Sequence, residues 1–75
     1  MKLFGYKKNE EAISPIELKE VTVLAEPKVL REMAKMLNES ADIIEKDYLG
    51  HLHLQDYWSE WVEKYPDFIV AQEED

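Results

Sequence analysis

The chain has 75 residues, no cysteine, 45% hydrophobic and 35% charged residues, a composition typical of one small folded domain and not of a disordered segment. Without cysteine there are no disulfides, thiolate nucleophiles, iron–sulfur clusters or thiolate zinc sites. Nine basic against seventeen acidic residues give a net charge of −8, which argues against nucleic-acid binding through phosphates.

The opening residues predict a short strand followed by a long loop. Residues 3–7 carry aromatic side chains at alternate positions, and the polar and proline residues of 9–15 separate this strand from the next. Charges among the first eleven residues leave no room for the apolar core of a signal peptide, and no apolar run reaches membrane-spanning length. We therefore expect a cytoplasmic protein that does not bind membranes.

The second predicted strand covers residues 18–25, whose β-branched centre favours an extended chain. Ile16 and Leu18 have the opposite alternation from the apolar residues that follow them. The strand therefore either begins after Lys19 or contains a bulge near Lys19 and Glu20 that resets the alternation.

A long amphipathic helix is the strongest structural signal in the chain. Apolar residues recur every three or four positions from Leu30 to Tyr48. Pro27 suits the first position of a helix, and Gly50 suits the position just beyond its end. We predict a helix over residues 27–49, about 34 Å long at 1.5 Å per residue.

Three short elements follow the helix. Residues 51–54 alternate strictly and predict a strand, Asp56 is a suitable N-cap for a short second helix that ends at Pro66, and residues 68–71 predict a last strand. The order strand, strand, helix, strand, helix, strand predicts a single α+β domain. We expect a two-layer sandwich in which the long helix covers one face of a mostly antiparallel four-stranded sheet.

The last third of the chain combines negative charge with aromatic rings. Residues 50–75 carry a net charge of −6, whereas residues 1–8 carry +3. Aromatic residues at helical spacing usually pack in the core, so of Tyr57, Trp58, Trp61 and Tyr65 we expect one ring on the surface. A surface ring rimmed by carboxylates has the composition of a binding hot spot. The predicted partner-binding residues are His51, His53, Asp56, Tyr57, Trp58, Glu60, Trp61, Glu63 and Asp67.

The two histidines permit a second interpretation. His51 and His53 would lie about 6 to 7 Å apart on one face of a strand, with Asp56 nearby in sequence, and such spacing suits a divalent metal. It equally suits partly exposed histidines beside aromatic rings, or a pair whose titration makes an interface sensitive to pH. The residues do not complete a site, so we predict no metal and no cofactor, and keep a metal-binding module as an alternative.

No catalytic motif is present in the chain. Its two glycines lie forty-five residues apart, which excludes a phosphate-binding loop, and its serines lack the context of a nucleophile elbow. Glu60 and Glu63 would be neighbours on a helix, but nothing indicates the pocket or the raised pKa that a catalytic carboxylate pair needs. We expect a protein without enzymatic activity.

Several segments resemble a known family. They are residues 21–27 leading into Leu30, Ala34 and Leu37, residues 51–54, Trp58 and Trp61, and residues 66–70. Over about residues 18 to 71 the chain resembles the small immunity proteins of bacterial polymorphic toxin systems, in particular the immunity family numbered thirty-two. Glu26 stands where a serine-like cap is expected, and the first fifteen residues offer no match. The resemblance implies a cytoplasmic protein that binds and blocks a cognate toxin domain without doing chemistry itself.

Negative charge is consistent with such a role. A toxin that degrades nucleic acid presents a basic surface to its substrate, and opposite charges speed encounter. Because one helix covers only one face of a sheet, the other face is left for the short helix, a partner or a second copy. We therefore expect a module that occludes a basic toxin domain through residues 51–67. The alternatives are the metal-binding module and a small homodimer.

Overall fold

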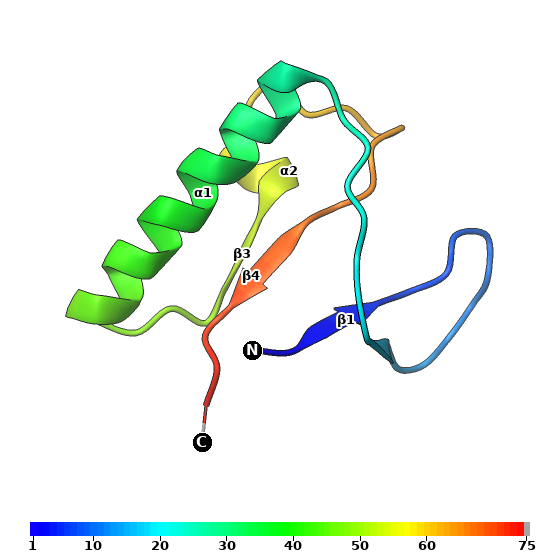
Figure 1. The fold of residues 1–75 in the computed structure, drawn as a ribbon, viewed down its shortest axis with the longest axis horizontal. Helices are drawn as coiled ribbons and strands as arrows, with labels where there is room; N and C mark the ends of the chain where they lie inside the picture. Colours follow the sequence, from blue (N-terminus) through cyan, green and yellow to red (C-terminus); the bar gives the residue numbers. More distant parts are fainter. Residues whose placement is uncertain (75) are drawn as a thin grey trace.

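The computed structural model describes residues 1–74 and contains two small antiparallel sheets and two helices (Figure 1). In chain order the elements are β1 (Leu3–Gly5), β2 (Ile16–Leu18), α1 (Pro27–Lys46), β3 (His51–His53), α2 (Leu54–Tyr57) and β4 (Ile69–Ala71). The predicted α+β class and the order β-β-α-β-α-β are confirmed. Of the helices in this part of the chain, none is long and apolar enough to cross a membrane.

The four strands form two separate sheets and not the single four-stranded sheet that we expected. β1 pairs antiparallel with β2, and β3 pairs antiparallel with β4, three residue pairs in each ladder. Within residues 1–74 no ladder joins one sheet to the other. Since α1 separates the two hairpins in sequence, no local turn sets a register between them, and only tertiary contacts can join them.

The second strand is shorter and earlier than the predicted strand over residues 18–25. β2 ends at Leu18, which lies opposite Leu3, the first residue of β1. Residues 19–26 therefore pass beyond the end of β1, find no partner strand, and continue as an extended linker. Neither of the two predicted explanations for the change in alternation applies, because the strand ends where the alternation changes.

The long helix begins where the sequence predicts and ends one turn earlier. Pro27 occupies the first turn, preceded by Glu26 in an extended conformation, and Asp47 ends the helix. The prediction that Gly50 ends the helix is wrong, because α1 ends at Lys46. Beyond the helix, the Leu49 side chain is buried and the Leu49 N–H donates to Gln72 Oε1 at 2.9 Å. Tertiary contacts with the C-terminal segment thus set the end of α1.

The second helix is a single turn, Leu54–Tyr57, so Asp56 lies inside it and does not cap it. Residues 58–65 form two successive tight turns, in which Trp61 N–H donates to Trp58 O and Tyr65 N–H donates to Val62 O. The Leu54 N–H donates to Phe68 O at 2.8 Å and continues the β3–β4 pairing, so the intervening residues must loop out and return. That return is incompatible with the predicted helix through Tyr65.

The core lies between α1 and the β3–β4 sheet (Figure 1). Met36, Leu54 and Trp58 form its buried centre, and the cross-strand pair Leu52 and Val70 packs against them. The chain thus has a helix-on-sheet layer, here called the body (residues 27–74). The N-terminal hairpin (residues 1–18) and its linker (residues 19–26) lie on the side of β4 away from α1 (Figure 1).

Candidate functional site

The histidine pair lies on the face of β3 opposite the core. Because side chains alternate along a strand, Leu52 faces the core while His51 and His53 face outward. Their ring centroids lie 5.0 Å apart in an edge-to-face arrangement, as expected for two histidines on one strand face. Across the ladder they are opposite Ala71 and Ile69, so the outer face of this sheet is mixed apolar and polar.

Asp67 ties the histidine strand to the loop that leads into β4. Its Oδ2 lies 2.5 Å from His53 Nδ1, and its Oδ1 accepts hydrogen bonds from the backbone N–H groups of Phe68 at 2.9 Å and Gln55 at 3.3 Å. The His53 and Asp67 side chains are 29% and 24% exposed, so solvent weakens each of these interactions. Asp67 was predicted as a binding residue, and the structure gives it a structural role as well.

The residues of the alternative metal-binding hypothesis are not brought together. Among residues 1–74 no group of three histidine, cysteine, aspartate or glutamate residues is placed to hold a metal ion. Asp56, the carboxylate near the histidines in sequence, lies on α2, and the carboxylate that reaches His53 is Asp67. The spacing of fourteen residues between His53 and Asp67 carries no local signal, so sequence reasoning could not have paired them.

The four aromatic rings are more enclosed than the sequence predicted. Trp58 is 6% exposed, and Tyr57, Trp61 and Tyr65 are each half-buried, so none of the four is a fully exposed anchor. Trp58 and Tyr65 stack with ring centroids 6.0 Å apart and an interplanar angle of 4°. Trp58 is therefore a core residue and is not accessible to a partner, while Tyr57 and Trp61 present part of their surface.

Tyr57 lies in an environment of carboxylates on α1. Burial, a hydrogen bond with Glu39 and the negative charges of Glu39 and Glu32 raise the pKa of Tyr57 above its ordinary value of 10.0. The neutral form of the phenol is therefore favoured beside the carboxylates of α1.

Three predicted residues form what we call the acidic edge: Asp56, Glu60 and Glu63. All three are exposed, and none has an ion-pair partner within 4.0 Å in the described part of the chain. Asp56 lies in α2, and Glu60 and Glu63 lie in the two turns that follow it, in the same stretch of chain as the half-buried rings of Tyr57 and Trp61. This edge combines uncompensated negative charge with partly accessible aromatic surface.

Sequence reasoning missed a second feature, the apolar surface of the N-terminal hairpin and linker. Large side chains there remain exposed: Phe4, Tyr6, Ile13, Ile16, Val21, Val23 and Leu24. The β-branched run of the linker was interpreted as a strand, so the exposure of its side chains could not be foreseen from alternation alone. The sequence did contain one signal for this exposed surface: the hairpin and linker hold more large apolar residues than so short a segment can bury.

Comparisons of the chain with models of protein families, with curated proteins and with solved structures gave no match. The resemblance to the immunity family therefore stays a prediction, and the site must be interpreted from its own geometry.

Proposed function

We propose that this chain is a non-enzymatic protein-binding module that inhibits a basic partner, a toxin domain of the kind the resemblance implies, by covering its cationic surface. The observation that carries the proposal is the acidic edge: three exposed carboxylates without ion-pair partners within residues 1–74, in the same short stretch of chain as the half-buried Tyr57 and Trp61. Unpaired carboxylates lose little by meeting a cation of a partner, because no internal ion pair has to break.

The charge of the whole segment supports the same interaction. Residues 50–75 hold one lysine and seven acidic residues, so the field around the acidic edge is negative beyond its three members. Such a field accelerates encounter with a basic surface and suppresses contact with acidic ones. Half-buried aromatic rings provide apolar contact area that is already ordered before binding.

The histidine pair gives no comparable support for catalysis. His51 and His53 lie on the outer face of β3 and line neither of the two cavities found along the hairpin in residues 1–74. Nδ1 of His53 is engaged with Asp67, an interaction that holds β3 against the loop before β4. This structural role accounts for the His53–Asp67 contact without a catalytic function.

The proposal is tested by binding to purified cationic toxin domains, measured by biolayer interferometry at low and at physiological salt. Neutralising the acidic edge with Asp56→Asn, Glu60→Gln and Glu63→Gln should weaken binding about tenfold or more, since each rim charge contributes about 0.5–1 kcal/mol. The effect should shrink as salt is added.

A matched control removes the same charge elsewhere, at the end of α1. Its substitutions are Asp42→Asn, Glu45→Gln and Asp47→Asn, three exposed positions without an ion-pair partner within 4.0 Å in the described chain. The control should change affinity by less than about threefold. Equal losses in the two variants, or binding that is insensitive to salt, would contradict recognition through the acidic edge.

A further inference from the structure

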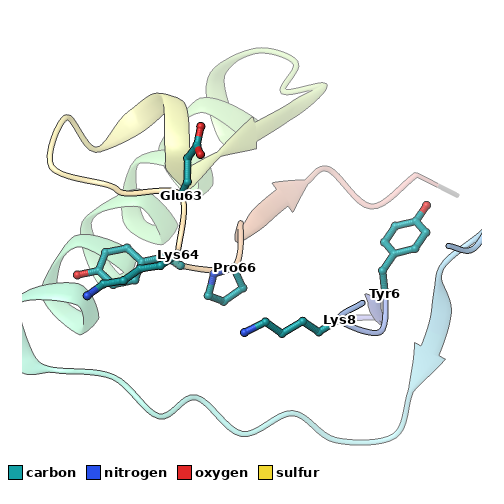
Figure 2. Close-up of a pocket in the computed structure, with 6 residues that line it drawn as sticks. Tyr6, Lys8, Glu63, Lys64 and Pro66 are labelled. Atoms are coloured by element: carbon teal, nitrogen blue, oxygen red, sulfur yellow. The ribbon is translucent and has the colours of Figure 1, made fainter. Parts of the chain in front are cut away.

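A large apolar cleft separates the N-terminal hairpin and linker from the body. It has a volume of about 1480 Å³ and is lined on one side by β1 and the linker and on the other by α1, the loop before β4 and β4 itself. A smaller cavity of about 380 Å³ lies between the hairpin and the loop over residues 63–66, where Lys8 extends toward Pro66 while the Glu63 carboxylate points away (Figure 2). The hairpin therefore lies beside the body without packing into it.

Two unpaired strand edges face this cleft. β1 bonds to β2 along one edge only, and β4 bonds to β3 along one edge only, and residues of both strands line the cleft. Within the chain, the exposed amino group of Met1 lies 3.4 Å from Glu73 Oε2, so the start of β1 lies near the end of β4. An antiparallel β1–β4 pairing in the register of this contact would set Leu3 opposite Ala71. A free edge is a template for pairing with another strand.

The chain also exposes more surface than a compact monomer of its size. Its accessible surface is 6726 Å², about 1,900 Å² above the roughly 4,800 Å² expected for 8.9 kDa. A standard interface removes about 800 Å² from each partner, so the excess is sufficient for a stable dimer. Leu24 is 93% exposed and Val23 45% exposed on the cleft wall, so this chain's own body does not cover them.

Charge indicates which surfaces of two copies would meet. Residues 1–8 carry +3 and residues 50–75 carry −6, so the start of β1 in one copy is attracted to the C-terminal part of another, whereas residues 9–18 carry −3 and leave the hairpin as a whole neutral. The eight-residue linker, which spans up to about 26 Å when extended, permits the hairpin to reach outward.

We infer that the cleft is occupied by a second copy of this chain, in a reciprocal dimer in which β1 of each copy pairs with β4 of the other. This arrangement pairs the β1 and β4 edges that face the cleft in both copies, and twofold symmetry closes this interface. Its pairing strands, β1 and β4, contain no residue of the acidic edge, and the inference does not depend on the proposed function.

Disulfide trapping tests the arrangement, and the absence of native cysteine makes the background clean. The single variants Leu3→Cys and Ala71→Cys are mixed and oxidised, and the proposal expects a disulfide between the two different chains. The control mixture of Ile13→Cys with Ala71→Cys should not cross-link, because Ile13 lies at the hairpin loop outside the cleft. A fast-migrating monomer from the double variant Leu3→Cys/Ala71→Cys, without cross-linked dimer, would show that the hairpin closes on its own body and would overturn the proposal.

Sedimentation without any partner gives the second readout. The wild-type chain should be a dimer at micromolar concentration, Val23→Asp should be monomeric, and Ile13→Asp should remain dimeric. Val23 lies in the linker outside helix and strand, and far-ultraviolet circular dichroism verifies that the body stays folded in each variant. A monomeric wild type, or a dimer that Val23→Asp leaves intact, would overturn the inference while leaving the acidic-edge proposal untouched.

Discussion

Replacing Met36 with alanine removes the side chain at the centre of the core. Met36 is 0% exposed and belongs to the buried cluster with Leu54 and Trp58, where α1 meets the body's sheet and α2. Truncation leaves a cavity lined by these neighbours, and it removes the contacts through which the helix holds both elements. The predicted consequence is a large loss of stability without a change of fold.

The size of the loss follows from how well the site can collapse. Removing a buried methionine costs about 2–5 kcal/mol, least where neighbours can refill the space. Trp61 and Tyr65 pack against the cluster but are only half-buried, so they can shift inward, and we expect about 2–3 kcal/mol. A chain of 75 residues has roughly 4–11 kcal/mol in total, so this loss lowers Tm by about 10–20 °C.

Urea unfolding followed by tryptophan fluorescence measures the loss, because Trp58 is in the same cluster. The control is Leu37→Ala, the next residue of α1, which is 47% exposed and should cost less than about 1 kcal/mol. Similar losses for the two variants, or a loss below about 1 kcal/mol for Met36→Ala, would refute the assignment of this core.

Three further predictions concern polar groups. Asp67→Ala should destabilise the chain by about 1–2 kcal/mol in urea unfolding, and Asp67→Asn by less, because asparagine retains the oxygen that accepts from Phe68 and Gln55; equal losses would contradict this role. Ser40 is buried and its Oγ has no hydrogen-bond partner within residues 1–74, so Ser40→Ala should stabilise the chain by about 0.5–1 kcal/mol, and a lower urea midpoint would argue against it. The raised pKa of Tyr57 means that its neutral form stabilises the fold: this contribution is complete below the unfolded pKa near 10 and is lost as pH rises through the folded pKa. Tyr57→Phe should therefore lose less stability than wild type between neutral and alkaline pH, and identical pH dependence in the two chains would contradict the shift.

The helix and the histidine strand show what local pattern can predict. The 3.6-residue stripe and Pro27 placed the start of α1 correctly, and strict alternation placed both imidazoles on one face of β3. These features depend on neighbours within a few positions. The end of α1 depends on Gln72, more than twenty residues away, and Gly50 was therefore a misleading stop signal.

The site was predictable in composition and not in arrangement. Asp56, Glu60 and Glu63 are exposed, as their charge suggests, but the burial of Trp58 depends on Met36 and Leu54 from other elements. The pairing of His53 with Asp67 likewise joins a strand to a distant loop. Composition could therefore indicate an acidic surface but not which aromatic rings it retains.

The amino-acid sequence alone determined the α+β class, the order of elements and the acidic character of the last third, because each follows from composition or from spacing along a single segment. Tertiary structure alone decided that the strands divide into two sheets, that residues 19–26 become a linker, and that a cleft opens between hairpin and body. The physical reason is that strand pairing depends on long-range contacts. The backbone groups along a strand edge are the same for every sequence, so packing and register between segments far apart in the chain determine which strands pair.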